Sequence, residues 1–203
     1  MDYTKLNDLR IFCPDSEKSF EDFLVNKKKI LIAINAEKIL NANDKLKNII
    51  NENIGYPDGF GAVIGMKKKG YKHAFKIPGC KLWLDIIKAH YLDKTFYIIG
   101  SKKHVLDKAV AKLKVEFKGI NILNYRDGYI KSKNEKDELF KDILIKKPDI
   151  VFVAMGSPNQ EFFMDELFEI HPALYQGLGG SIDGYTGHVK LATKWWRDNN
   201  LEW

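Results

Sequence analysis

The sequence predicts an α/β fold in which helices cover both faces of a parallel sheet within a single domain. Apolar runs of strand length alternate along the chain with segments of helical period, which indicates repeated strand–helix units. The strand runs are apolar almost throughout, as is typical of parallel strands buried on both faces. The 203 residues contain no internal repeat and no linker rich in serine or glycine, so residues 1–203 are expected to form one domain.

The first expected strand covers residues 30–34 (ILIAI), and a helix follows it. Asn35 is suited to cap this helix, because its side chain can accept a hydrogen bond from an unpaired backbone N–H group. Glu37 places a negative charge in the first turn, where the helix dipole favours it. The apolar residues that follow lie on one helical face: Ile39, Leu40, Leu46, Ile49 and Ile50.

The alternation continues to the end of the chain. Further strands are expected at residues 95–99, 120–123, 149–154 and 174–178. Helices are expected at residues 104–117, 135–145 and 158–170, and a helix rich in tryptophan closes the chain. Ligands of such sheets bind beyond the carboxyl ends of the strands, so the residues that follow each strand are the first candidates for a site.

The net charge of +6 comes mainly from lysine, which clusters at residues 27–29, 67–69, 102–103 and 146–147. Such clusters are either solvated helix ends and loops or a surface that attracts phosphates or acidic lipid. No nucleic-acid-binding motif accompanies them, so no nucleic-acid partner is expected.

The cysteine pattern and the apolar runs bear on the compartment. Cys13 and Cys80 form neither a metal-binding spacing nor a disulfide framework, which favours a reducing cytoplasm. The first ten residues lack the order of a signal peptide. No apolar run approaches the roughly 18 residues of a spanning helix. We therefore expect a cytoplasmic chain that does not cross a membrane by itself.

Three of the expected strands lead into glycine, at Gly100-Ser101, at Gly156-Ser157-Pro158 and at residues 177–180 (GLGG). Glycine lets a ligand approach the backbone, and the helix that follows presents free N–H groups to a phosphate. Three such ends at one edge of a sheet indicate a site for an anion or a nucleotide. They do not indicate which nucleotide.

The glycine spacing of residues 59–65 (GFGAVIG) is close to that of a dinucleotide-binding motif. Their spacing is one residue longer than the common form, and no clear strand precedes them, so a nicotinamide enzyme is a distant alternative. The sequence also lacks the P-loop, zincin and hydrolase-elbow motifs, and it has no D-x-D pair to hold a metal against a diphosphate. We therefore expect no metal and no cofactor, with phosphate charge met by backbone N–H groups, helix ends, lysine or arginine.

Asp58 has two interpretations. It lies in Pro57-Asp58-Gly59, and this composition favours a turn. A carboxylate fixed at the end of a strand could also take a proton from a hydroxyl nucleophile. The residue types alone favour the turn.

Several short motifs appear along the chain in the order of a known family. They are Asn35-Ala36-Glu37, Pro57-Asp58-Gly59, Lys76-Ile77-Pro78-Gly79, residues 96–100, Arg126-Asp127-Gly128-Tyr129, residues 148–161, residues 177–180, Asp183, Gly187 and Leu201-Glu202-Trp203. The most specific is the G-x-P-x-Q-E motif at residues 156–161. With these motifs the chain resembles the WecG/TagA/CpsF family, glycosyltransferase family twenty-six, from about residue 30 to its end.

The resemblance implies a Rossmann-like domain and an inverting transferase. The enzyme would move a sugar from a UDP-sugar donor to a polyprenyl-diphosphate-linked sugar acceptor without a metal. Relatives transfer N-acetylmannosamine or its uronic acid in the synthesis of teichoic acid, enterobacterial common antigen or capsule. It also implies a bacterial protein bound peripherally to the inner face of the plasma membrane, with a homo-oligomer possible among its partners.

The resemblance further assigns roles to single residues. Asp58 matches the proposed general base, and Gln160 matches an active-site glutamine. Lys76 stands where the family often has arginine, and a lysine lacks the bidentate fork of arginine. With the glycine-rich strand ends, the expected substrate-binding residues are Asn35, Gly59, Lys76, Gly100, Ser101, Gly156, Pro158, Glu161, Gly179, Gly180 and Asp183.

The chain departs from the family pattern in three places. Ala33 stands where many members have threonine, and residues 188–193 (HVKLAT) replace an Arg-Ala-Pro step. Members continue past the final Leu201-Glu202-Trp203 into an arginine-rich appendage that docks on the membrane. We expect this chain to lack the appendage through truncation. Together these departures leave a second interpretation open, a nucleotide-sugar-binding protein with little or no transferase activity.

Overall fold

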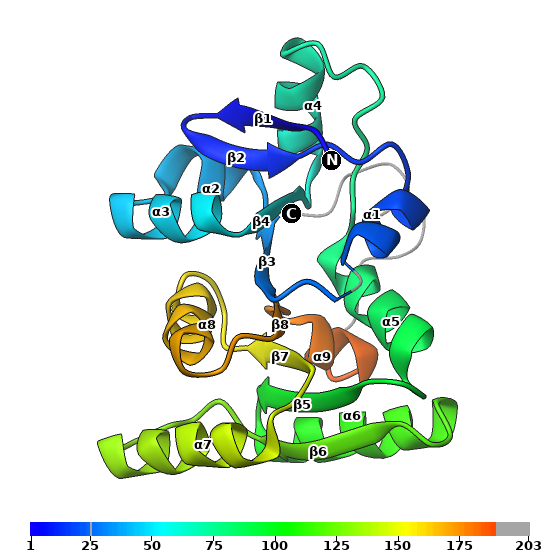
Figure 1. Cartoon of the computed structure of the whole chain (residues 1–203), viewed down its shortest axis with the longest axis vertical. Coiled ribbons are helices and arrows are strands. Elements are labelled where there is room, and N and C mark those ends of the chain that lie inside the picture. The colour runs from blue at the N-terminus through cyan, green and yellow to red at the C-terminus, as the bar shows by residue number, and fades with distance from the viewer. Residues whose placement is uncertain (25, 190–203) are drawn as a thin grey trace.

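A parallel sheet forms the centre of this computed structural model, which describes residues 1–24 and 26–189. In that part, six strands lie in the order β4-β3-β8-β7-β5-β6, and all neighbouring strands run parallel (Figure 1). The strands are β3 (Lys29–Ile34), β4 (Ile54–Pro57), β5 (Thr95–Gly100), β6 (Asn121–Arg126), β7 (Ile150–Ala154) and β8 (Leu174–Gly177). The predicted α/β fold is therefore confirmed, and the carboxyl ends of all these strands meet at one edge.

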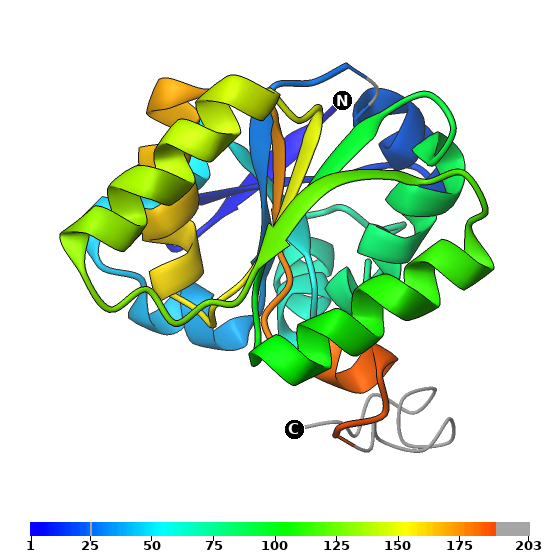
Figure 2. The same ribbon diagram turned by 90° about the horizontal axis from the view of Figure 1, so that it is seen from below.

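Helices cover both faces of the sheet, as Figure 2 shows with the sheet seen nearly edge-on. One face packs against α1 (Glu17–Leu24), α5 (Gly79–His90), α6 (Lys103–Glu116) and α9 (Ser181–Tyr185). The other packs against α3 (Asp44–Glu52), α7 (Lys133–Lys146) and α8 (Asn159–Ile170), with α2 (Ala36–Asn41) beside α3. Each face has its own apolar core, because strands such as β7 are buried along their whole length. No helix among the described residues is both long and apolar enough to span a bilayer.

An antiparallel hairpin, β1 (Tyr3–Leu6) and β2 (Leu9–Phe12), lies beside β4 and packs with α4 (Phe60–Lys68). Leu9 and Ile11 of the hairpin are fully buried. The Arg10 guanidinium donates a hydrogen bond from Nη2 to the backbone oxygen of Asn53 at 3.1 Å. The hairpin thereby shields the β4 side of the sheet, where an exposed edge strand would be open to pairing with other chains.

Most of the predicted elements are confirmed, with small shifts of their ends. The strand expected at residues 120–123 extends to Arg126, and the helix expected after Asn35 is divided into α2 and α3. The division falls at Asn43, whose side chain caps α3 by accepting the N–H of Leu46 at 2.9 Å. The closing helix rich in tryptophan and the departure at residues 190–193 lie outside the described residues.

The expectation that no strand precedes residues 59–65 was wrong, because β4 lies there. Its four residues include Gly55 and Pro57, which weaken any strand signal in the sequence. The structure tolerates Pro57 because it is the last residue of the strand and pairs opposite Ile34 of β3. All four residues of β4 are buried.

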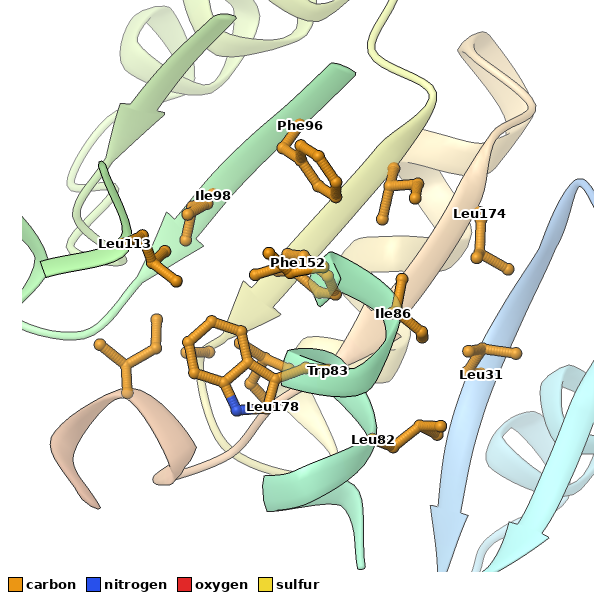
Figure 3. Packing of buried hydrophobic residues seen from close by; sticks show 14 of the residues in the cluster. Leu31, Leu82, Trp83, Ile86, Phe96, Ile98, Leu113, Phe152, Leu174 and Leu178 are labelled. Atoms are coloured by element: carbon orange, nitrogen blue, oxygen red, sulfur yellow. The ribbon is translucent and has the colours of Figure 1, made fainter. Parts of the chain in front are cut away.

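The core on the α5 face is built around aromatic rings (Figure 3). The Trp83 ring of α5 meets the Phe152 ring of β7 edge to face, with centroids 5.8 Å apart. Phe152 also stacks on Phe96 of β5, with centroids 6.1 Å apart. Aromatic pairs of this kind contribute stability beyond their buried area, so Phe152 joins the helix layer to two central strands.

Replacing Phe152 with alanine should lower the free energy of unfolding by about 3–5 kcal/mol, because it leaves a cavity between α5 and the sheet. The matched control is Val115→Ala on α6, where the side chain is 74% exposed. That change should shift stability by less than about 0.5 kcal/mol. Urea unfolding followed by far-UV circular dichroism measures both. Similar small losses in the two variants would contradict the packing described.

Candidate active site

A cleft of about 660 Å³ opens at the carboxyl edge of the sheet. Its walls come from five segments: Ala33 in β3 with residues 35–38 after it, residues 58–61 after β4, Lys76 with residues 78–80 before and in α5, Ser157 with Gln160, and residues 177–181 at the end of β8 and after it. A second cavity, of about 390 Å³, lies at the opposite edge, around residues 147–150 and 171–174. The predicted site residues gather at the first of these, so the cleft is the candidate site.

The cleft brings together seven of the residues that the sequence singled out. They are Asn35, Asp58, Gly59, Lys76, Gln160, Gly179 and Gly180. Ala33, the position where the family often has threonine, lines the cleft as well. Segments that are more than a hundred residues apart in the chain, such as Asp58 and Gln160, thus face one hollow.

The other predicted residues do not line this cleft: Gly100, Ser101, Gly156, Pro158, Glu161 and Asp183. Ser101 and Asp183 lie together at the same edge of the sheet, and the Ser101 hydroxyl donates a hydrogen bond to Asp183 Oδ2 at 3.3 Å. At Gly100 a Cβ atom would lie 2.2 Å from the backbone oxygen of Ala154. Glycine is therefore required there for the contact between β5 and β7, independently of any ligand.

Asp58 follows β4 directly and is half-buried in the wall of the cleft. Its backbone N–H donates to the oxygen of Ile34 at 3.0 Å, and its Oδ1 accepts the N–H of Gly79 at 3.0 Å. The carboxylate is thereby fixed between the end of β4 and the start of α5. The chain passes here from β4 into α4, so Asp58 combines a local structural contact with access to the cleft.

A buried polar side chain lies behind this wall of the cleft and donates a hydrogen bond to it. Gln176 of β8 is fully buried, and its Nε2 donates to the oxygen of Gly79 at 3.3 Å and to the Tyr56 hydroxyl at 3.5 Å. Burial, and after it the nearby Asp58 carboxylate, raises the pKa of the Tyr56 phenol well above its ordinary value. Tyr56 therefore stays protonated at physiological pH.

Gln160, on the first turn of α8, connects two walls of the cleft. Its Oε1 accepts the N–H of Gly179 at 2.9 Å, although only 5% of the residue is exposed. At Gly177 a Cβ atom would lie 2.5 Å from Gln160 Nε2. The lack of a side chain at position 177 therefore makes room for the glutamine, which fixes the loop after β8.

Lys38, which lines the cleft from α2, is a further site residue that no sequence motif predicts. Its Nζ lies 3.3 Å from Oε1 of Glu161, and the two side chains are 10% and 1% exposed. A lysine in the first turns of a helix normally indicates a solvated surface, so nothing in the sequence marked this one. The weak signal available was its position, three residues after the cap at Asn35.

Charges of both signs line the cleft, from Lys38 and Lys76 and from Glu37 and Asp58. Within residues 1–24 and 26–189, no group of three histidine, cysteine, aspartate or glutamate side chains is placed to hold a metal ion.

The glycines of the GFGAVIG segment (residues 59–65) make close packing contacts. A Cβ at Gly61 would meet Ala36 at 2.9 Å, and one at Gly65 would meet Leu6 at 2.6 Å.

A sequence model of the glycosyl transferase WecG/TagA/CpsF family matches residues 6–203, nearly the whole chain. The chain belongs to this family. The predicted membership is therefore confirmed, and the protein is a glycosyltransferase of polysaccharide synthesis. The matched range includes every segment that lines the cleft.

In this WecG/TagA/CpsF family member, Gly177→Ala should displace Gln160 and break its hydrogen bond to Gly179. Overpacking of this kind lowers stability by about 1–3 kcal/mol. Gly180→Ala is the matched control, because a Cβ there meets nothing within 4 Å. It should change stability by no more than about 1 kcal/mol in either direction.

Chemical denaturation of both variants, and of Gly177→Ala combined with Gln160→Ala, measures the effect. If the clash with Gln160 is the main cause, removing the glutamine side chain should recover most of the loss at position 177, with the contact to Met164 Cε at 3.2 Å remaining. An equal loss with and without Gln160 would contradict the packing described.

Proposed function

We propose that this glycosyltransferase moves a sugar from a UDP-sugar to a polyprenyl-diphosphate-linked sugar acceptor, with inversion at the anomeric carbon and without a metal ion. The observation that carries the proposal is the Asp58 carboxylate, held at the wall of a cleft of about 660 Å³ at the carboxyl edge of the sheet. Family membership supplies the reaction class, and the cleft offers a place for it.

In the proposed reaction the acceptor hydroxyl attacks the anomeric carbon of the donor. Its proton passes to Asp58, a bond forms between the acceptor oxygen and the anomeric carbon, and the bond from that carbon to the UDP oxygen breaks. UDP leaves with the electron pair. A base that is fixed by Gly79 before substrate arrives loses little freedom during the step.

Charge on the departing diphosphate needs compensation. The lysines of the cleft wall and the backbone N–H groups of its glycine-rich segments are the groups available for it. Lys76 is suited to this role as a point charge. The family resemblance supports three further parts of the proposal. The donor carries N-acetylmannosamine or its uronic acid, the protein binds peripherally at the inner face of the plasma membrane, and it forms a homo-oligomer.

UDP should bind the native protein in the presence of EDTA. A ligand that binds only the folded state adds roughly 2.7 kcal/mol of stability at a free concentration of about 100 times its Kd. Thermal unfolding with and without UDP, each with EDTA or with added magnesium, measures this. Stabilisation by UDP that disappears in EDTA would contradict the metal-free part of the proposal.

The location of UDP can be followed in the same samples through the exposed Cys80, which lines the cleft. Bound UDP should slow its alkylation by iodoacetamide at pH 8. Burial raises the pKa of Cys13 to about 11, so that thiol reacts slowly and serves as the internal control. Binding of UDP without protection of Cys80 would point to the cavity at the opposite edge of the sheet.

Asp58→Asn should lower the transfer rate by about a hundredfold to ten-thousandfold, the range for loss of a general base. Asparagine keeps an oxygen to accept the Gly79 N–H, so the fold and UDP affinity should change little. The measurement is UDP release with a polyprenyl-diphosphate-linked acceptor, beside UDP affinity and thermal unfolding. Asp107→Asn, a change on the exposed surface of α6, is the control.

Two results would contradict this assignment. If Asp58→Asn unfolds and activity falls only in proportion to the folded fraction, Asp58 is a structural residue of the β4–α4 connection. If the unmodified protein binds UDP but releases none from UDP-sugars with such an acceptor, the interpretation as a binding protein without transferase activity holds instead.

A further inference from the structure

A buried ion pair lies under the floor of the cleft. Lys38 of α2 and Glu161 of α8 approach to 3.3 Å between Nζ and Oε1, and Glu161 is almost completely buried. Lys38 lines the cleft, whereas Glu161 does not. The lysine therefore lies between the carboxylate and the open space.

A buried ion pair of this kind usually contributes little to the free energy of unfolding. Removing two charges from water costs several kcal/mol for each ion, and a well-packed apolar pair is often as stable. Glu161 Oε1 accepts a further hydrogen bond from Gln160 Nε2 at 3.4 Å, but Oε2 has no hydrogen-bond partner among the described residues. Stability alone therefore does not account for this pair.

The geometry suits Lys38 to meet an anion. An ammonium group has three N–H donors, and among the described residues Glu161 is the carboxylate paired with it. The stem of Lys38 is enclosed by protein, so the group loses little freedom when a ligand binds. The neighbouring Gln160 fixes the Gly179 loop across the cleft, so the opposing wall is also in place.

We propose that Lys38 binds a phosphate of a substrate diphosphate and that Glu161 is a positioning residue, which holds the ammonium group in place at the wall of the cleft. This inference rests on the proposed function for the identity of the substrates. The diphosphate has two sources there, the UDP-sugar donor and the lipid-linked acceptor, and the chemistry of the contact is the same for both.

The test compares Lys38→Met, Glu161→Gln and the double variant. Each single variant leaves one charge buried without its partner, whereas the double variant removes both and is the one expected to keep the fold. Lys68→Met on the exposed surface of α4 makes the same change of charge away from the cleft. Thermal unfolding establishes that each protein is folded, and calorimetry gives the Kd of inorganic pyrophosphate, UDP and uridine.

Loss of a hydrogen bond to a charged group corresponds to a roughly tenfold to hundredfold change in affinity. We expect a rise of this size in the Kd of pyrophosphate for Lys38→Met and for the double variant, and none for Lys68→Met or for uridine. Glu161→Gln alone should raise the Kd less. It should add nothing in the Lys38→Met background, because a positioning residue acts through the group that it positions.

The two sources of the diphosphate give different results. If UDP affinity falls together with pyrophosphate affinity, Lys38 meets the donor. If UDP affinity is unchanged and the KM of the lipid-linked acceptor rises in the transfer assay, Lys38 meets the acceptor.

Unchanged pyrophosphate affinity in a folded double variant would overturn the inference, and the pair would then only join α2 to α8. If the unmodified protein binds pyrophosphate through Lys38 but gains nothing from the uridine part of UDP, the inference stands. In that case it is the UDP donor of the proposed function that fails.

Discussion

The burial of a parallel sheet on both faces is the constraint on which the rest of the structure depends. Neighbouring parallel strands must be joined by crossovers, so all their carboxyl ends point to one edge. The central strands are filled mainly with apolar side chains, and most of the polar groups of the cleft follow the end of a strand. Asn35 after β3, Asp58 after β4 and the glycine loop after β8 occupy these positions, and that is why they share a cleft.

The connections at this edge are held by the same side chains that are candidates for chemistry. Asp58 accepts the N–H of Gly79, and Gln160 accepts the N–H of Gly179, so each fixes a neighbouring loop. A turn residue and a catalytic base are therefore not exclusive interpretations of Asp58. Preorganisation requires that a reacting group be held before substrate arrives, and the backbone contact supplies this.

Elements with a strong local signal could be predicted from the sequence, and elements that depend on distant contacts could not. β3, β5 and β7 consist mainly of continuous apolar runs, and Asn35 was predicted as the cap that it is. β4 contains Gly55 and Pro57 and owes its conformation to pairing with β3.

For the site, the resemblance of the motifs to the family predicted Asp58 and Gln160. The position of Lys38 in the site could not be predicted from the sequence, because its burial depends on Glu161, more than a hundred residues later in the chain. The sequence also could not tell that Gly100 serves the contact of β5 with β7.

The distribution of buried polar groups supports the same edge as the functional one. Of the seven buried polar or charged residues in the described part of the chain, four lie at or beneath the cleft: Lys38, Gln160, Glu161 and Gln176. Glu161 Oε2 and Gln176 Oε1 lack hydrogen-bond partners among the described residues, and a buried polar atom without a partner costs about 1–3 kcal/mol. Well-packed apolar residues in place of a buried ion pair such as Lys38–Glu161 are often as stable or more stable. These buried polar groups lie at or beneath the edge where the strands end, which is expected where polar groups are kept for a substrate rather than for the core.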